Sequence, residues 1–283
     1  MRGTIVVTTV AELRDRRGPR DAVGLAPTMG ALHEGHLSLI RRSAAENGLT
    51  VVSVFVNPTQ FNDPFDLALY PRSLERDTEL AASAGADLVF APDMETVYPP
   101  GFATGVHVAN VTEQWEGESR PGHFDAVATV VSILLNQVRP DRAYFGEKDF
   151  QQLAMIRQLH RDLALPGEIV ACPTVREPDG LAMSSRNARL TDAERAVAPF
   201  LYQALSAMSE AARRGERSSL KLAILGAVIM KRASEVELEY LQIVDPGTLE
   251  PLEVAAPGAR AIIAATIGGT RLIDNIPLPE IEA

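Results

Sequence analysis

Two apolar runs that pass through glycine-containing turns into helical segments constrain the fold of this chain most strongly. Residues 22–26 form the first run, and residues 27–36 connect it to a segment in which Leu37 and Ile40 share one helical face. Residues 142–152 repeat this order of strand, glycine turn and helix. Strands that alternate with helices along a chain predict a parallel sheet.

A third run indicates how that sheet is covered. Residues 49–56 are almost all apolar or β-branched, which is typical of a parallel strand buried on both faces. Asn57 and Pro58 predict a turn at the end of this strand. We therefore expect an α/β fold, in which residues 1–175 form a Rossmann-like parallel sheet with helices on both faces.

The pattern changes in the last third of the chain. Two long helices and three strands are expected there, at residues 191–215, 218–233, 236–244, 259–267 and 270–274. The pair Gly268 and Gly269 predicts a hairpin turn before the last strand. We expect residues 176–283 to form a smaller α+β C-terminal domain that acts as a lid.

The composition argues against some classes of binding partner. The chain has 27 Lys and Arg against 37 Asp and Glu, and its net charge of -10 argues against binding to nucleic acid or to an acidic membrane. The single cysteine, Cys172, excludes an intrachain disulfide and suits a reducing compartment. Neither a leader pattern nor an apolar run of membrane-spanning length is present, so we expect a cytoplasmic protein.

Residues 27–36 carry the strongest chemical signal. The first turn of a helix has unpaired N–H groups and the positive end of the helix dipole, and both attract phosphate. Gly30 and Gly35 let a ligand approach the backbone, and His33 and His36 can donate hydrogen bonds to phosphate oxygens. Each residue alone is more often a turn or packing residue, but the combination favours a phosphate site. Zinc is disfavoured because the metalloprotease signature needs histidines four apart, not three.

Two later stretches are candidates to complete such a site. Lys148 stands where its ammonium could meet phosphates, and Asp149 can cap the helix that follows. Residues 183–187 crowd two hydroxyls, a guanidinium and an amide into one loop, which suits a triphosphate better than a structural turn. A surface ion pair and an exposed linker are the alternative interpretations.

Other polar residues have less specific signals. Asn57 and Gln60 follow a buried strand, where ligands bind in open α/β sheets, but a solvated loop fits them equally well. Asp77 could meet a metal, although we expect it on the solvated surface of a charged helix. Residues 92–122 are rich in proline, glycine and aromatic residues, which predicts a lid, a binding loop or a cover for a sheet edge.

Four segments together resemble the pantothenate synthetase family. They are residues 27–36, 55–61, 146–152 and 183–187, and the resemblance runs over nearly the whole chain. The His-x-Gly-His and Met-Ser-Ser-Arg motifs within them resemble paired signatures of the nucleotidylyltransferase superfamily, which shares them with class I aminoacyl-tRNA synthetases. Ala126 departs from the glycine that the family commonly has after its His-Phe pair.

This resemblance implies an ATP-dependent ligase that condenses pantoate with β-alanine to pantothenate, releasing AMP and pyrophosphate. The carboxylate of pantoate would attack the α-phosphate of ATP to give pantoyl adenylate, and the amine of β-alanine would then displace AMP. Mg2+ would bridge the phosphates, mostly through water, and no protein ligand stands out for it. The resemblance also implies a homodimer with small-molecule substrates and no nucleic-acid or membrane partner.

The resemblance assigns a role to individual residues. His36 would be the proton donor, with His33, Lys148 and Arg186 as the other catalytic residues. Gln60 and Gln152 would bind pantoate, and Gln60 would also border β-alanine. The ATP-binding residues would be Met29, Gly30, Ala31, Leu32, His33, Glu34, Gly35, His36, Gly146, Glu147, Lys148, Asp149, Val175, Met183, Ser184, Ser185 and Arg186.

Two other functions fit the same motifs. A nucleotidylyltransferase acting on a phosphorylated acceptor would keep the nucleotide on that acceptor and release no AMP. A non-catalytic nucleotide sensor could retain the fold, because fold does not determine function, and it would consume no ATP.

Overall fold

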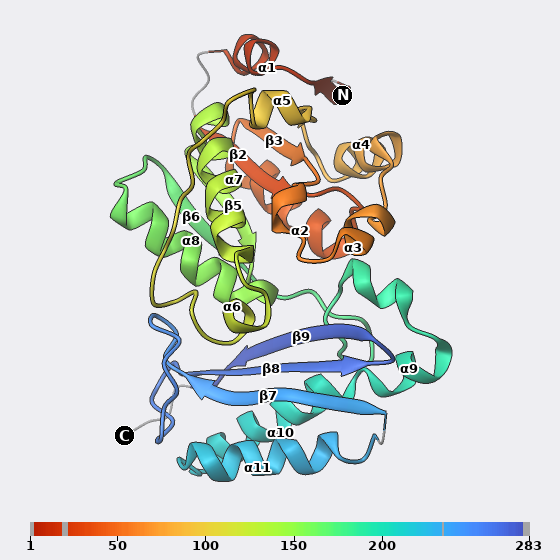
Figure 1. Ribbon diagram of the computed structural model, residues 1–283, viewed down its shortest axis with the longest axis vertical. Helices are drawn as coiled ribbons and strands as arrows, with labels where there is room; N and C mark the ends of the chain where they lie inside the picture. The colour runs from red at the N-terminus through yellow and green to blue at the C-terminus, as the bar shows by residue number, and fades with distance from the viewer. Residues whose placement is uncertain (1–2, 19–21, 234, 280–283) are drawn as a thin grey trace. The chain divides into compact units, whose positions relative to one another are not determined.

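A computed structural model describes residues 3–18, 22–233 and 235–279 (Figure 1). The chain forms two compact units. The first unit contains Met1–Gly146 and Met155–Pro173, and the second contains Glu147–Ala154 and Thr174–Ala283. Glu147–Ala154 therefore belong to the second unit, although they precede the single boundary expected after residue 175.

The first unit is built on a six-stranded parallel sheet with strand order β1-β4-β3-β2-β5-β6 (Figure 1). The strands are β1 (Ile5–Val7), β2 (Val23–Thr28), β3 (Leu49–Val54), β4 (Leu88–Phe90), β5 (Arg142–Gly146) and β6 (Glu168–Cys172). After β4 the chain returns to place β5 beside β2, with Gly24 opposite Arg142. This reversal makes the carboxyl ends of β2 and β5 the place where open α/β sheets bind ligands.

Both faces of this sheet are buried, as the long apolar run predicts. Ala26 of β2 lies opposite Val52 of β3, and both belong to one apolar cluster with residues of α2 (Glu34–Glu46). The adjacent residues Leu25 and Val51 point to the other face, because side chains alternate along a strand, and they are buried as well. The expected α/β sheet is therefore confirmed.

Helices and short turns connect the strands. They are α1 (Val10–Arg17), η1 (Pro58–Gln60), α3 (Pro64–Leu69), α4 (Leu74–Ser83), α5 (Met94–Val97), α6 (Glu116–Ser119), α7 (His123–Val138), η2 (Glu147–Asp149) and α8 (Phe150–Asp162). The long helix α7 is buried along most of its length and contacts β2 and α1. The division between the units falls inside α8.

The second unit has a three-stranded antiparallel sheet of order β7-β8-β9. Its elements are η3 (Ser185–Arg189), α9 (Asp192–Val197), α10 (Phe200–Arg213), α11 (Ser219–Met230), β7 (Val236–Val244), β8 (Arg260–Ile267) and β9 (Thr270–Pro277). Gly268 and Gly269 form the predicted turn between β8 and β9, with φ angles of 53° and 80°. Positive φ at both positions is what a tight two-residue hairpin requires, and glycine adopts it without strain.

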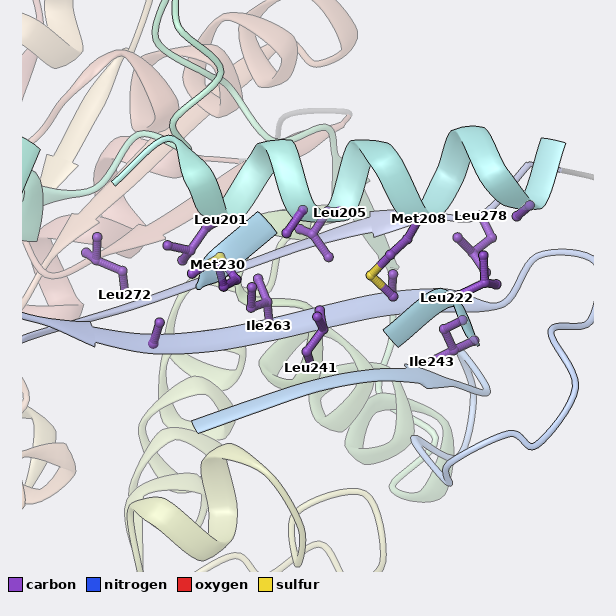
Figure 2. Packing of buried hydrophobic residues seen from close by; sticks show 14 of the residues in the cluster. Leu201, Leu205, Met208, Leu222, Met230, Leu241, Ile243, Ile263, Leu272 and Leu278 are labelled. Carbon is purple, nitrogen blue, oxygen red and sulfur yellow. The ribbon is translucent and has the colours of Figure 1, made fainter. Parts of the chain in front are cut away.

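One face of this small sheet packs on α10 and α11 (Figures 1 and 2). Figure 2 shows Leu205 and Met208 of α10 and Ile263 of β8 among the apolar side chains of this core. Gly226 of α11 lets the helix approach closely, because a Cβ there would lie 2.7 Å from Leu241 and 2.9 Å from Met208. The second unit thus has an apolar core of its own.

The expected helix over residues 191–215 is wrong in one respect. The structure divides it into α9 and α10, with a break at Ala198 and Pro199. Proline has no amide hydrogen to continue the helical hydrogen bonds, so α9 ends before Pro199 and α10 begins after it.

We expect Leu205→Ala to destabilise the protein by about 2–5 kcal/mol, because the fully buried leucine would leave a cavity between α10 and the sheet. Urea denaturation measures this change. Leu220→Ala on α11 is the matched control, since its side chain is 70% exposed and should change the free energy of unfolding by no more than about 0.5 kcal/mol. Equal losses in the two variants would contradict the described core.

Candidate functional site

The predicted phosphate motif lies at the junction of β2 and α2, as expected. Gly30 and Ala31 both have positive φ angles, of 81° and 50°, so the backbone turns sharply directly after the strand. His33 is the N-cap of α2, and its Nδ1 accepts a hydrogen bond of 3.1 Å from the amide of Gly35. The glycine and the histidine cap together bring the chain into the first turn of the helix.

The two histidine rings of this motif are in contact and are tilted by 38° relative to each other. The ring centroids of His33 and His36 are 4.1 Å apart. The Nδ1 of His36 accepts the amide hydrogen of His33 at 3.4 Å, so Nδ1 is an acceptor in both rings. A neutral imidazole carries one proton, which must then sit on Nε2 in each ring. Both residues therefore present Nε2–H as a hydrogen-bond donor.

Asp77 corrects the expectation of a solvated surface residue. Its side chain is buried, and its carboxylate accepts hydrogen bonds from the amides of Ala31 at 3.0 Å and Leu32 at 2.8 Å. The same carboxylate stands 2.7 Å from where a Cβ on Gly30 would lie. Asp77 therefore holds the turn of the phosphate motif, and the two amides it binds are already occupied by an anionic group.

The candidate substrate residue Gln60 lies in η1 at the end of β3. Its Nε2 is 2.7 Å from the sulfur of Met29, and its Oε1 accepts from Asn57 at 3.2 Å. Its backbone carbonyl accepts hydrogen bonds from His123 Nδ1 at 2.9 Å and from Arg120 at 3.4 Å. Met29 and Gln60, predicted from separate motifs, therefore touch each other.

Arg120 and His123 were not predicted as site residues. Because His123 Nδ1 donates to Gln60, its Nε2 is the acceptor for the guanidinium of Arg120, 3.0 Å away. Arg120 comes from the irregular segment 92–122, so this end of the segment supports the turn that carries Gln60. A histidine at a helix start and an arginine before a Pro-Gly pair give no sequence signal for that role.

Asn57 has a structural role. It is buried, and its side chain bonds the carbonyl of Ala126 at 3.3 Å and the hydroxyls of Tyr98 and Thr59 at 3.0 Å and 2.9 Å. Asn57 thus ties β3 to α7 rather than facing solvent. Ala126 takes part through its backbone, so the replacement of the usual glycine leaves this contact intact.

A pocket in the second unit brings together several predicted phosphate residues. Lys148, Arg186 and Arg271 all line it, and the guanidinium of Arg271 is paired with Glu239 at 2.8 Å. Ser184, Asn187 and Asp274 contribute polar groups to the same lining. Lys148 and Arg186 are therefore the positive side chains of this lining that are suited to phosphate oxygens. Arg271, on the hairpin strand β9, was not predicted.

The loop at residues 183–187 is held by its own neighbours. The amide of Met183 donates to the carbonyl of Val175 at 3.0 Å, so these two predicted nucleotide residues lie side by side. Ser184 Oγ accepts from the amide of Arg186 at 3.2 Å, and Asn187 donates to Glu177 at 2.9 Å. The loop is therefore held by one hydrogen bond within it and by bonds to Val175 and Glu177.

Two acidic residues near Lys148 are paired with arginines. Glu147, predicted to bind ATP, directs one carboxylate oxygen to Arg260 at 2.8 Å. Asp274 is buried in a bidentate pair with Arg176, at 2.6 Å and 3.0 Å. Burial raises the pKa of Asp274, and the guanidinium of Arg176 opposes that shift.

The predicted residues divide between the two units. The first unit holds Met29, Gly30, Ala31, Leu32, His33, Glu34, Gly35, His36, Gln60 and Gly146, and the second holds Glu147, Lys148, Asp149, Gln152, Val175, Met183, Ser184, Ser185 and Arg186. Glu34 is exposed and pairs with Arg41. Gln152 is half-buried on α8.

Metal clusters and membrane-spanning helices are both absent from the part of the chain that the structure describes. Within residues 3–18, 22–233 and 235–279, no group of three or more His, Cys, Asp or Glu side chains could hold a metal ion. Over the same residues, every helix is too short or too polar to cross a membrane.

We expect Asp77→Asn to lower the free energy of unfolding by about 1–3 kcal/mol, because an NH2 group, which cannot accept, would replace one of the two oxygens that accept from Ala31 and Leu32. Urea denaturation checks this value. Glu79→Gln makes the same chemical change at an exposed position of α4 and should alter stability by less than about 0.5 kcal/mol. An Asp77→Asn protein as stable as this control would show that the carboxylate does not hold the turn.

Comparison with known sequences gives one consistent family. The family model for pantoate-beta-alanine ligase matches residues 5–277. A pantothenate synthetase of Cereibacter sphaeroides is 51% identical over 277 residues, which cover 96% of this chain and 99% of the relative. A pantothenate synthetase of Thermus thermophilus is 52% identical over 271 residues, which cover 95% and 98% of the two chains.

Solved structures agree with the sequence matches. The crystal structure of pantothenate synthetase from Thermus thermophilus has a TM-score of 0.93 at 51% identity and covers 97% of this chain and 99% of that chain. Pantoate-beta-alanine ligase from Francisella tularensis, complexed with beta-gamma ATP and beta-alanine, has a TM-score of 0.79 at 34% identity, covering 97% and 98%. By sequence and by fold, this chain belongs to the pantoate-beta-alanine ligase family.

Proposed function

We propose that this chain is an ATP-dependent ligase that condenses pantoate with β-alanine to pantothenate. Family membership supports the overall reaction, and the Francisella relative was solved with an ATP compound and β-alanine. The observation that carries the proposal in this chain is the pocket whose lining brings Lys148 and Arg186 together. A chain with a net charge of -10 needs such a local concentration of cations to hold ATP.

The proposed reaction begins with adenylyl transfer. A carboxylate oxygen of pantoate attacks the α-phosphorus of ATP, the bond from that phosphorus to the β-phosphate oxygen breaks, and pyrophosphate leaves. Negative charge grows on the leaving pyrophosphate, so donors fixed around it lower the barrier. Lys148 and Arg186 supply positive charge for this step, and the Nε2–H groups of His33 and His36 supply hydrogen bonds to phosphate oxygens.

The second step forms the amide bond. The neutral amine of β-alanine attacks the acyl carbon of pantoyl adenylate, the bond from that carbon to the phosphate oxygen breaks, and AMP leaves. The amine nitrogen loses its proton as the amide forms. Gln60 and Gln152 are proposed to hold pantoate, because an amide side chain can bond both hydroxyl and carboxylate groups without acting as a nucleophile.

Mg2+ is proposed to enter with ATP as part of the substrate. The described residues contain no cluster of acidic and histidine ligands, and Mg2+ commonly keeps several waters and binds mainly through phosphate oxygens. The residues present fit that mode, in which the ion adds positive charge at the phosphates.

We further propose that the second unit acts as a lid and that the protein works as a cytoplasmic homodimer.

The reaction is tested by measuring AMP and pyrophosphate from purified protein with ATP, Mg2+ and pantoate, with and without β-alanine. We expect steady AMP release only when both pantoate and β-alanine are present. Pyrophosphate in the absence of β-alanine, limited to about one equivalent per active site, would reveal the adenylate step.

Other outcomes identify the alternatives. ATP consumption that leaves the nucleotide on a phosphorylated acceptor and produces no AMP would favour a nucleotidylyltransferase. Unchanged ATP under all conditions would favour a non-catalytic nucleotide sensor and overturn the proposed function.

We expect His36→Ala, Lys148→Ala and Arg186→Ala each to lower kcat by about 10²–10³-fold, the effect of removing one donor to developing charge. Circular dichroism should show that the variants remain folded. Lys221→Ala is the control, because its ammonium is exposed on α11 and pairs with Glu216. Near-normal turnover in folded forms of all three site variants would contradict the assigned roles.

A further inference from the structure

We infer that Asn275 is a positioning residue that acts through Lys148, and that Arg260 orients Asn275 for this purpose. The inference rests on the proposed function, because it assigns Lys148 to the phosphates of ATP. Asn275 lies on β9 and Arg260 on β8, far along the chain from the turn η2 that carries Lys148. All three residues belong to the second unit.

The side-chain amide of Asn275 holds the backbone of η2 at two successive residues. Its Nδ2 donates to the carbonyl of Glu147 at 2.9 Å and to the carbonyl of Lys148 at 2.8 Å. An amide NH2 has two hydrogens, so this pair of bonds uses both. Because the Lys148 carbonyl is itself bonded, the backbone from which the ammonium chain extends is directly restrained.

Arg260 determines which way the amide points. Its Nε donates to Asn275 Oδ1 at 2.7 Å, and its Nη2 donates to Glu147 Oε2 at 2.8 Å. A reversed amide would set its oxygen against two carbonyl oxygens and its NH2 against a guanidinium, so only the observed orientation is satisfied. The guanidinium also lies 4.0 Å over the ring of Phe150, the first residue of α8. Arg260 thus touches the residues on both sides of the turn.

The strand that carries Asn275 is fixed as well. The backbone carbonyl of Asn275 accepts from Arg176 at 3.3 Å, and the same guanidinium pairs with Asp274. Asn275 and Arg260 are only 3% and 7% exposed. Burying a polar amide and a guanidinium is unfavourable unless their hydrogen bonds are made, and here those bonds converge on the turn of Lys148.

The consequence for catalysis follows from geometry. The ammonium of Lys148 is useful only if it reaches the phosphates, and a misplacement of about 1 Å can lower a rate by about 10²-fold. Without the amide of Asn275, two backbone carbonyls lose their donors and the turn is free to relax. Loss of Asn275 should therefore reproduce, in part, the loss of the Lys148 ammonium.

The test is a double-mutant cycle on kcat for AMP formation, with radiolabelled ATP to resolve the slow variants. We expect Asn275→Ala to lower kcat by about 10–10²-fold with the KM for pantoate unchanged, because the substitution misplaces one catalytic group. In the Lys148→Ala background, Asn275→Ala should change kcat by less than about 2-fold, since the group on which it acts is gone. The thermal midpoint of each variant confirms that it is folded.

Two further variants extend the double-mutant cycle. Arg260→Lys keeps the charge but removes the planar guanidinium that orients Asn275. It should therefore lower kcat only when the Lys148 ammonium is present. This variant also takes the place of Asn275→Ala in the cycle if the Asn275→Ala protein does not fold. Asn136→Ala, an exposed residue of α7 whose amide donates to Ser132 at 2.9 Å, is the control and should leave kcat unchanged.

The outcomes separate this inference from the proposed function. A folded Asn275→Ala protein with normal kcat, or one whose loss is equally large with and without the Lys148 ammonium, would overturn the positioning role. A natural protein that forms no AMP from ATP, pantoate and β-alanine would instead overturn the proposed function itself.

Discussion

The buried carboxylate of Asp77 sets the path of the chain where β2 passes into α2. It binds the amides of Ala31 and Leu32 at the point where the backbone takes two successive positive φ angles. An unpaired buried charge is strongly unfavourable, so the carboxylate and the turn require each other. The histidine cap of α2 and the contact between the His33 and His36 rings follow directly from this turn. Their chemistry therefore depends on a residue that belongs to another helix.

In the second unit, a different set of buried polar groups restrains the turn that carries a proposed ligand-binding residue. There, the turn that carries Lys148 is held by Asn275 and Arg260 from the hairpin β8–β9, whose own position comes from the apolar core beneath it (Figure 2). In each unit the motif supplies the group proposed to meet the ligand, and a buried polar side chain from a distant segment restrains its backbone. Such support is the usual condition for a site that is ordered before its ligand arrives.

These supporting residues mark the limit of what could be predicted from the sequence. The parallel sheet, the junction at His33 and the turn at Gly268 were predictable, because the strands, helices and turns that build them are signalled by residue patterns within a few positions. Asp77, however, bonds residues 45 and 46 positions away, and Asn275 bonds residues 127 and 128 positions away. An Asp in a charged helix and an Asn in a strand look like surface residues until the fold brings their partners to them. The break at Pro199 was visible in the sequence, yet the apolar pattern across it indicated one helix.

The cations around the pocket of the second unit also affect how an anionic ligand approaches. Lys148 and Arg186 place two positive side chains in the lining of this pocket, in a chain whose net charge is -10. At physiological ionic strength charges are screened beyond about 8 Å, so the pocket attracts ATP only at close range, while the rest of the surface repels it weakly from farther away. Association should therefore gain little from long-range steering. Because the electrostatic potential of the pocket is screened, ATP is attracted to it only after diffusion has brought the two close together.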